Sequence, residues 1–135
     1  MIKHTCEIQV RYAETDQMQF AHHSSYIIWF ELGRIELLKQ FGVSYADLEK
    51  KGCLMPVLEI NVQFLKYAVF DEKIFLTTLM PEAPAAKQVF EYTIHNLKNE
   101  IICKGSSLHT FMNTQNKAIK PPKELRDKLK PFFHQ

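Results

Sequence analysis

A single long helical pattern, with one strand-like segment before it and four after it, limits this chain of 135 residues to few folds. Between Ser24 and Gly42, apolar residues recur at steps of three and four, a spacing that places them on one face of a helix. The members of this face are Tyr26, Trp29, Phe30, Gly33, Leu37 and Phe41. Either Ser24 or Ser25 can cap the first N–H groups, and Gly42 suits a left-handed end. Four more apolar residues widen the face, so we expect the helix to be largely buried: Ile27, Ile28, Ile35 and Leu38.

The other segments have the alternation of period two that is typical of half-buried strands. They cover residues 6–12, 58–64, 73–80, 88–97 and 101–112. In the first of them, Ile8, Val10 and Tyr12 point to the same face. Two shorter helices are expected, one over residues 45–51 and one that begins at Pro122. This order predicts one α+β domain over residues 1–135, in which an antiparallel sheet packs against the long helix.

Composition excludes several classes of protein. The 17 Lys and Arg residues nearly balance the 15 Asp and Glu residues, and a net charge of +2 argues against a nucleic-acid-binding protein. The glycines form no phosphate-binding loop. No apolar segment is long enough to span a bilayer, and no signal peptide is visible. The wide spacing of Cys6, Cys53 and Cys103 predicts buried, reduced thiols in a cytoplasmic protein.

The segment from Tyr12 to Tyr26 is the richest in reactive side chains, with two carboxylates, two histidines and two tyrosines before a helix N-terminus. The free N–H groups of such a terminus can polarise an acyl carbonyl, and a nearby Asp can attack it or activate a water. The simpler alternative is that Asp16 caps a turn and that His22 and His23 are solvated. Adjacent histidines point in different directions, so we expect no metal site here.

These residues form a recognisable pattern: Tyr12-x-x-x-Asp16, His23 seven residues later, then Tyr26, Trp29-Phe30-Glu31 and Arg34. The pattern resembles the signature of the 4-hydroxybenzoyl-CoA-type acyl-CoA thioesterases. Asp71-Glu72 and residues 120–125 resemble two further segments of that family, so the resemblance extends over nearly the whole chain. It implies the hotdog fold, in which an antiparallel sheet of about five strands wraps around one long central helix.

The resemblance implies roles for three residues. Asp16 aligns with the essential carboxylate of the family, the nucleophile or general base that acts on the thioester. His23 aligns with the histidine at the start of the central helix, where its backbone N–H polarises the carbonyl and its side chain positions substrate. Tyr12 falls on a tyrosine that orients the acid by a hydrogen bond. No metal or organic cofactor is implied.

Other ionisable residues are predicted to be structural. Glu31 and Arg34 lie one helical step apart, a spacing that permits a salt bridge. His95 and His109 fall in strand patterns and are expected to be cross-strand or surface residues.

Three positions depart from the family pattern. Met18-Gln19 stand where relatives often have Gly, which predicts a narrower loop or a changed backbone path. Tyr67 stands where Pro is common, and His22 where Tyr is frequent. Both substitutions are expected to alter the choice of acyl group or the edge of the CoA channel.

The function predicted from the resemblance is hydrolysis of an acyl-CoA thioester to a free acid and CoA. The resemblance also implies a homodimer or homotetramer, in which paired sheets hold the CoA at their interface. Three alternatives stay open: a thioesterase for acyl groups on acyl carrier protein, a hydratase or dehydratase of the same fold, and a non-catalytic acyl-CoA-binding module.

Overall fold

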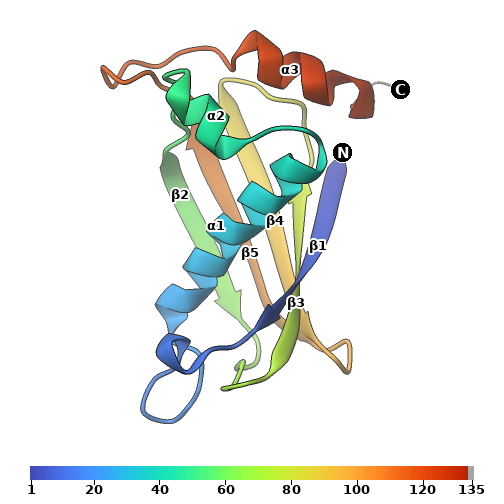
Figure 1. Ribbon diagram of the computed structural model, residues 1–135. Coiled ribbons are helices and arrows are strands. Elements are labelled where there is room, and N and C mark those ends of the chain that lie inside the picture. The colour runs from blue at the N-terminus through green and yellow to red at the C-terminus, as the bar shows by residue number, and fades with distance from the viewer. Residues whose placement is uncertain (134–135) are drawn as a thin grey trace.

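Five antiparallel strands form one sheet in residues 1–133, the part of the chain that the computed structural model describes (Figure 1). The strands are β1 (Ile2–Gln9), β2 (Val57–Phe64), β3 (Lys73–Met80), β4 (Lys87–Asn96) and β5 (Ile101–Thr110). Their order across the sheet is β1-β3-β4-β5-β2, and every neighbouring pair is antiparallel. The predicted antiparallel sheet is confirmed, and β1 and β2 form its two edges.

The helix α1 crosses one face of this sheet (Figure 1). The helices are α1 (His23–Gln40), α2 (Tyr45–Lys50) and α3 (Lys123–Leu129), with the short 3-10 helices η1 (Tyr12–Glu14) and η2 (Lys130–Phe132). Two glycines permit a close approach between α1 and the sheet. A Cβ atom at Gly33 would lie 2.2 Å from Thr78 Oγ1, and one at Gly105 would lie 2.6 Å from the ring of Phe30.

The ends of α1 differ in part from the prediction. Gly42 has a φ of +85° just beyond the helix, as expected of a left-handed end. At the other end, the expected Ser24 or Ser25 cap is wrong. His22 is the N-cap, since its Nδ1 accepts a hydrogen bond from the N–H of Ser24 at 3.1 Å. Ser25 lies inside the helix, where its hydroxyl donates to the carbonyl of Glu14 at 2.8 Å.

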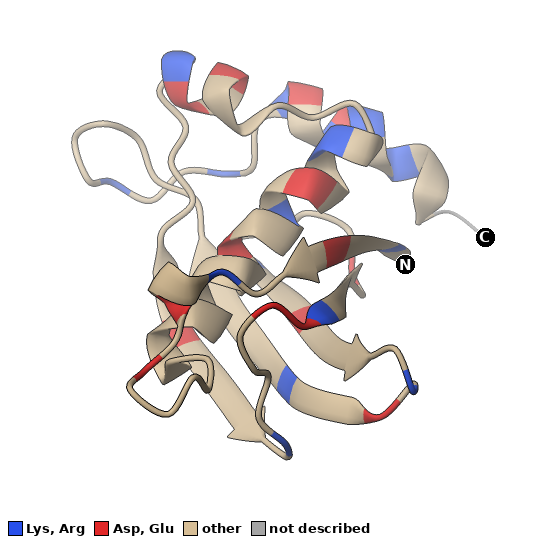
Figure 2. Cartoon of the chain, turned by 60° about the horizontal axis from the view of Figure 1, so that its bottom comes forward, with Lys and Arg blue, Asp and Glu red and all other residues tan. Residues whose placement is uncertain are grey.

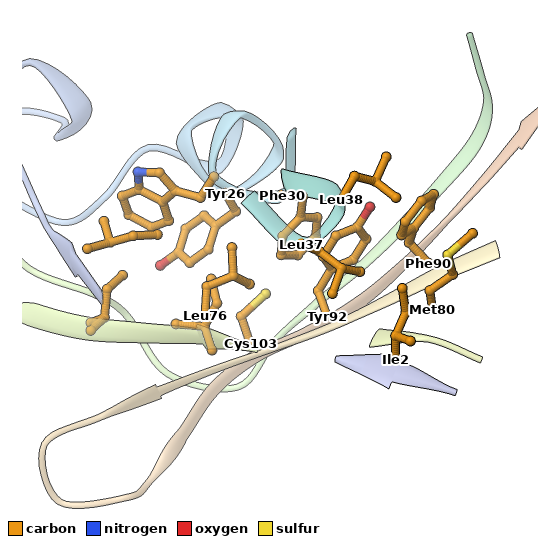
Figure 3. Packing of buried hydrophobic residues seen from close by; sticks show 14 of the residues in the cluster. Ile2, Tyr26, Phe30, Leu37, Leu38, Leu76, Met80, Phe90, Tyr92 and Cys103 are labelled. Carbon is orange, nitrogen blue, oxygen red and sulfur yellow. The ribbon is translucent and has the colours of Figure 1, made fainter. Parts of the chain in front are cut away.

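The inner face of α1 packs onto aromatic side chains of the sheet (Figure 3). The rings of Phe30 and Tyr92 stack with centroids 4.1 Å apart. Trp29 is buried, as predicted. The outer face is less buried than predicted, because Ile27, Ile28 and Leu32 are exposed in the single chain.

The salt bridge that the spacing of Glu31 and Arg34 permits is not formed in residues 1–133. Arg34 lies on the inner face of α1 and is buried, whereas Glu31 is exposed on the outer face. The Arg34 guanidinium donates instead to the Tyr92 hydroxyl at 2.9 Å. Tyr92 contacts the Ser107 hydroxyl at 2.6 Å, and Ser107 contacts Nε2 of His109 at 2.7 Å. His109 is thus fully buried and not a surface residue.

The first strand begins and ends earlier than predicted. It covers Ile2–Gln9, after which Val10 forms backbone hydrogen bonds with Asp71 and Glu72 instead of continuing the ladder. The chain then turns through η1. Tyr12 is therefore exposed and does not share the buried face of Ile8 and Val10, which corrects the predicted alternation.

Two further predictions concern cysteines and membranes. All three thiols are free; Cys53 and Cys103 are buried, and Cys6 is partly buried. No helix within residues 1–133 is long and apolar enough to cross a membrane.

Candidate active site

The loop before α1 is folded around the carboxylate of Asp16. Its Oδ1 accepts hydrogen bonds from the backbone N–H groups of Met18 at 2.8 Å and Phe20 at 3.2 Å. The backbone N–H of Asp16 donates to the carbonyl of Phe20 at 2.8 Å, which closes the loop. Oδ2 has no hydrogen-bond donor among residues 1–133. Asp16 therefore caps a turn with one oxygen, and its other oxygen has no protein donor within residues 1–133.

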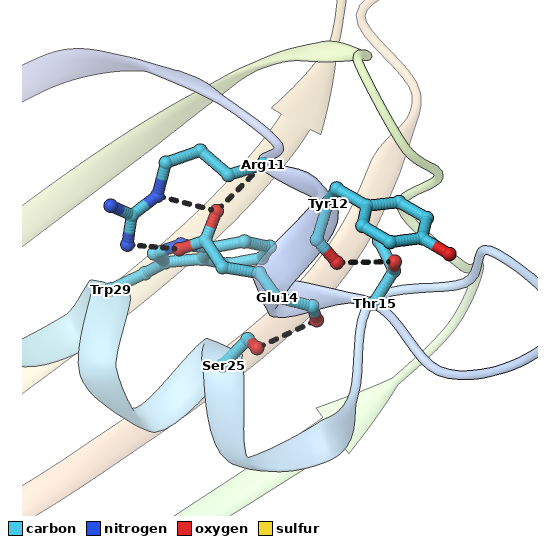
Figure 4. Close-up of polar contacts among 6 residues, drawn as sticks. All are labelled: Arg11, Tyr12, Glu14, Thr15, Ser25 and Trp29. Atoms are coloured by element: carbon cyan, nitrogen blue, oxygen red, sulfur yellow. Dashed lines mark hydrogen bonds and ion pairs between the residues drawn. The ribbon is translucent and has the colours of Figure 1, made fainter.

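A second carboxylate, Glu14, ties this loop to α1 (Figure 4). Its Oε2 accepts a hydrogen bond from the indole N–H of Trp29 at 2.7 Å, and its Oε1 accepts one from the backbone N–H of Arg11 at 2.8 Å. The Glu14 carbonyl accepts from Ser25 Oγ and from the N–H of His22, both at 2.8 Å. Partial burial opposes ionisation of Glu14, but the bonds from Arg11 and Trp29 prevail and lower its pKa.

The connection between β2 and β3 holds the other side of the loop. The N–H of Ala21 donates to the carbonyl of Ala68 at 2.8 Å, and the N–H of Phe70 donates to the carbonyl of Gln19 at 2.9 Å. Between these bonds, Phe20 and Val69 form an isolated antiparallel bridge. The loop is thus fixed by main-chain hydrogen bonds to a segment about 50 residues later in the sequence.

The Asp16 loop, the start of α1 and the end of β2 with the connection that follows it line a surface pocket of about 210 Å³. Its lining combines polar and aromatic side chains: Asp16, Phe20, Ala21, His22, His23, Tyr26, Phe64 and Tyr67. The pocket therefore places the predicted Asp16 and His23 together, at the start of an 18-residue helix. Within residues 1–133 its lining includes no Lys or Arg, so the groups available there for chemistry are a carboxylate, imidazoles and a helix terminus.

The two histidines lie side by side at the helix start. Their ring centroids are 4.1 Å apart. His22 uses its ring nitrogen to cap α1, whereas the backbone N–H of His23 has no acceptor among residues 1–133. This N–H sits at the positive end of the helix dipole and can polarise an oxygen placed in the pocket.

Tyr12 lies outside this pocket. Its ring is 69% exposed and packs edge-on against Phe70, with centroids 5.5 Å apart. Within residues 1–133 its hydroxyl makes no hydrogen bond to Asp16, and Figure 4 shows that the contact to Thr15 is through the Tyr12 carbonyl. The single chain therefore unites two of the three predicted site residues.

A cysteine lies beside one lining residue of the pocket, since Cys103 pairs with Phe64 across β5 and β2. It is fully buried, and burial raises the pKa of its thiol to about 12. A thiol with that pKa stays protonated at neutral pH and is a poor nucleophile. The carboxylate of Asp16 is the better candidate.

Comparison with known proteins places the chain in a family. A family model described as the thioesterase-like superfamily matches residues 10–129. The chain belongs to the thioesterase-like superfamily. This confirms the family expected from the sequence pattern, and the predicted enzyme class, thioester hydrolase, is that of the superfamily.

The chain is similar to two proteins that are named as thioesterases. The chain is 39% identical over 110 residues to YneP of Bacillus subtilis, named as a candidate acyl-CoA thioesterase, and the match covers 82% of this chain and 80% of that one. A DHNA-CoA thioesterase from Staphylococcus aureus is 32% identical with a TM-score of 0.89, over 98% of this chain and 93% of that one.

A more distant solved structure is a 4-hydroxybenzoyl-CoA thioesterase variant in complex with 4-hydroxybenzoyl-CoA. It is 12% identical with a TM-score of 0.83, over 95% of this chain and 99% of that one, and at this identity it shows the fold alone. The five-stranded antiparallel sheet of this chain thus has the strand topology of the hotdog fold.

Of the aromatic lining, the sequence analysis named Tyr26 and Tyr67, but it did not place Phe20 or Phe64 in the site and did not identify the contacts of Glu14. Phe64 lies more than 40 residues from Asp16 and reaches the pocket only because β2 ends beside α1. Phe20 offered a local signal, an aromatic residue in a polar loop next to the predicted acid. Glu14 offered no such local signal, because nothing in its spacing from Trp29 indicates a hydrogen bond between them.

Proposed function

We propose that this protein hydrolyses an acyl-CoA thioester to the free acid and CoA, with Asp16 as the acting carboxylate. The observation that carries the proposal is the pocket lined by both Asp16 and His23, in which, among residues 1–133, one carboxylate oxygen of Asp16 has no donor and the backbone N–H of His23 has no acceptor. Membership of the thioesterase-like superfamily and the acyl-CoA substrates in the names of its relatives support the same reaction.

In the proposed reaction, the carbonyl oxygen of the thioester accepts a hydrogen bond from the His23 N–H. Oδ2 of Asp16 removes a proton from a water molecule, whose oxygen attacks the carbonyl carbon. The carbon–sulfur bond then breaks, the CoA thiolate leaves and takes up the proton, and the acyl group departs as the acid. In the nucleophilic variant, Oδ2 attacks the carbon directly, the carbon–sulfur bond breaks and the CoA thiolate leaves, which gives an anhydride between Asp16 and the acyl group. Water then cleaves the anhydride to the free acid and the Asp16 carboxylate, and one proton of that water passes to the thiolate. Both variants require the same ionised carboxylate.

The third residue that the motif predicts is Tyr12, and its role stays a prediction. Its hydroxyl is free of protein partners in residues 1–133, and Tyr12 directly precedes the loop of Asp16. We propose that it orients the acid when substrate is bound. Replacement by Phe is then expected to lower kcat and leave the fold unchanged.

We further propose that the active form is a homodimer paired along β2. This strand is a sheet edge with exposed apolar residues, and Leu58 is 48% exposed. Charged residues concentrate on the helices and turns (Figure 2), whereas Glu59 is the one charge on β2. An edge of this kind is a template for pairing with another strand. Because Phe64 belongs to both β2 and the pocket, a second copy would cover the pocket opening.

The test is thiol release from short, medium and aromatic acyl-CoAs by the wild type and by Asp16→Asn. The amide keeps the size of the side chain and removes its charge, so we expect turnover to fall at least about 100-fold, the low end for a lost acid–base group. Unfolding midpoints of the two proteins serve as the fold control.

Other outcomes separate the alternatives. Release of thiol from acyl carrier protein esters but not from CoA esters would show that the substrate is carried by acyl carrier protein, and the proposed mechanism would be unchanged. Consumption of substrate without thiol release would indicate a hydratase or dehydratase. Tight binding of an acyl-CoA with no turnover would overturn the enzymatic proposal in favour of a binding module.

A further inference from the structure

We propose that the acyl group binds against an aromatic wall made of Phe20, Phe64 and Tyr67, and that this wall favours compact, planar acyl groups over long flexible chains. The inference rests on the proposed function, because it assigns the part of the substrate that lies next to the thioester carbonyl.

The aromatic wall is directly connected to the proposed acid. The backbone N–H of Phe20 donates to Oδ1 of Asp16 at 3.2 Å, and both residues line the same pocket. Phe20 and Tyr67 stack with centroids 4.9 Å apart and an interplanar angle of 21°. The same pocket holds Asp16 and these rings, so we place the acyl group of a thioester whose carbonyl carbon reaches Asp16 against the rings.

The position of the aromatic wall is fixed by the main chain. The bridge between Phe20 and Val69 and the bond from Ala21 to Ala68 hold the two ring-bearing segments together on either side of the stack. Tyr67 itself is 66% exposed, so its ring faces the pocket and solvent and not the core. Flat rings held in place in this way bind planar π-systems by stacking, which adds to the burial of apolar area.

The floor of the pocket excludes long chains. The Tyr26 hydroxyl accepts a hydrogen bond from the N–H of Ala68 at 3.1 Å. The Tyr26 ring meets the rings of Trp29 and Phe64 edge-on, each with centroids 5.0 Å apart. Below it, Cys103 is fully buried. The space between α1 and the sheet is therefore filled, and an acyl chain cannot extend from the pocket into the core of this protomer.

The experiment compares benzoyl-CoA with cyclohexanecarbonyl-CoA, two substrates of equal carbon number that differ in planarity, and adds palmitoyl-CoA for length. We expect kcat/KM to favour benzoyl-CoA over the saturated ring by about three- to tenfold, the range that aromatic stacking gives. Palmitoyl-CoA is expected to be the poorest substrate. In Tyr67→Ala the preference for benzoyl-CoA should disappear, and in Tyr67→Phe it should persist.

Leu97→Ala, on the exposed hairpin turn between β4 and β5, is the matched control and should keep the wild-type ratio. Equal rates on the two ring substrates, rates that rise with chain length, or a Tyr67→Ala variant that keeps the benzoyl preference would each overturn the inference.

A binding measurement separates this inference from the proposed function. Titration calorimetry with the non-hydrolysable thioethers benzyl-CoA and cyclohexylmethyl-CoA reports on the aromatic wall without turnover. The wild type could bind benzyl-CoA more tightly than cyclohexylmethyl-CoA, lose this preference in Tyr67→Ala, and yet hydrolyse no thioester. That result would support the aromatic wall and overturn the proposed hydrolase activity. Hydrolysis with no difference in affinity or rate between the planar and the saturated ring would support the hydrolase activity and overturn the aromatic wall.

Discussion

Gln19 has a backbone conformation that its residue type disfavours. Its φ is +64°, in the left-handed region, where the other non-glycine residues within 1–133 are Asp71, Asn99 and Asn116. Asn and Asp tolerate that region, whereas a longer side chain costs about 1 kcal/mol there. Gln19 is also one of the two positions, with Met18, where the resemblance described above leads us to expect Gly. The backbone path of the loop is thus maintained by its hydrogen bonds despite the unfavourable residue.

We therefore expect Gln19→Gly to raise the free energy of unfolding by up to about 1 kcal/mol. The measurement is urea unfolding of the wild type and the variant. Gln17→Gly, in the same loop but at a residue without positive φ, is the matched control and should be neutral or destabilising. Equal effects of the two substitutions would contradict the strain at Gln19.

His109 gives the fold a pH dependence of its own. Burial, and then the charge of Arg34, lower the pKa of His109 from 6.5 to about 4. Between these two values the unfolded chain binds a proton that the folded chain does not, so stability should fall as the pH drops from about 6.5 to about 4. Unfolding midpoints in urea across this range measure the slope.

His109→Gln is expected to reduce that slope, whatever its effect on stability at pH 7. A variant with the same pH dependence as the wild type would show that the His109 imidazole is not held neutral in the folded protein.

At the scale of elements, Glu14 joins η1 to the start of α1. Glu14→Ala leaves the buried indole N–H of Trp29 without its acceptor and should cost about 1–3 kcal/mol of stability. Chemical unfolding of Glu14→Ala, Trp29→Phe and the double variant measures the coupling between them. We expect the cost of Glu14→Ala to shrink when Trp29 is already Phe, and strictly additive effects would contradict a direct bond. The exposed Glu91 provides the control substitution to Ala.

Local patterns predicted the elements well, because helices and strands follow from the spacing of nearby apolar residues. The 18-residue α1 and the strands after it lie within a few residues of the predicted bounds. Contacts between distant segments were not predictable in this way. The bond from Arg34 to Tyr92 joins residues 58 apart, and it replaces the local pairing with Glu31 that helical spacing permits. The motif located Asp16 and His23, but the stack of Phe20 on Tyr67 depends on the tertiary position of the β2–β3 connection.

At the scale of the whole molecule, the proposed pairing along β2 makes assembly and activity depend on each other. Leu58→Glu places a charge on the exposed edge strand and should convert dimers to monomers, which sedimentation velocity can measure. Turnover should fall with it, since the pocket opens at this edge. Leu97→Glu adds the same charge on a distant turn and should leave both unchanged. A monomeric wild type with full activity would refute the pairing.

The way the Asp16 loop is held affects how the protein can change over evolutionary time. Backbone N–H groups donate to Oδ1 of Asp16, and main-chain hydrogen bonds tie the loop to the β2–β3 connection. The donors to Asp16 and the bonds of the loop therefore do not depend on which side chains the neighbouring residues carry. The rings of Phe20 and Tyr67 stack in the pocket, and the bonds of Phe20 to Asp16 come from its main chain and not from its ring. Mutations at these two positions can therefore give descendants new substrates while the inherited position of the acid is kept.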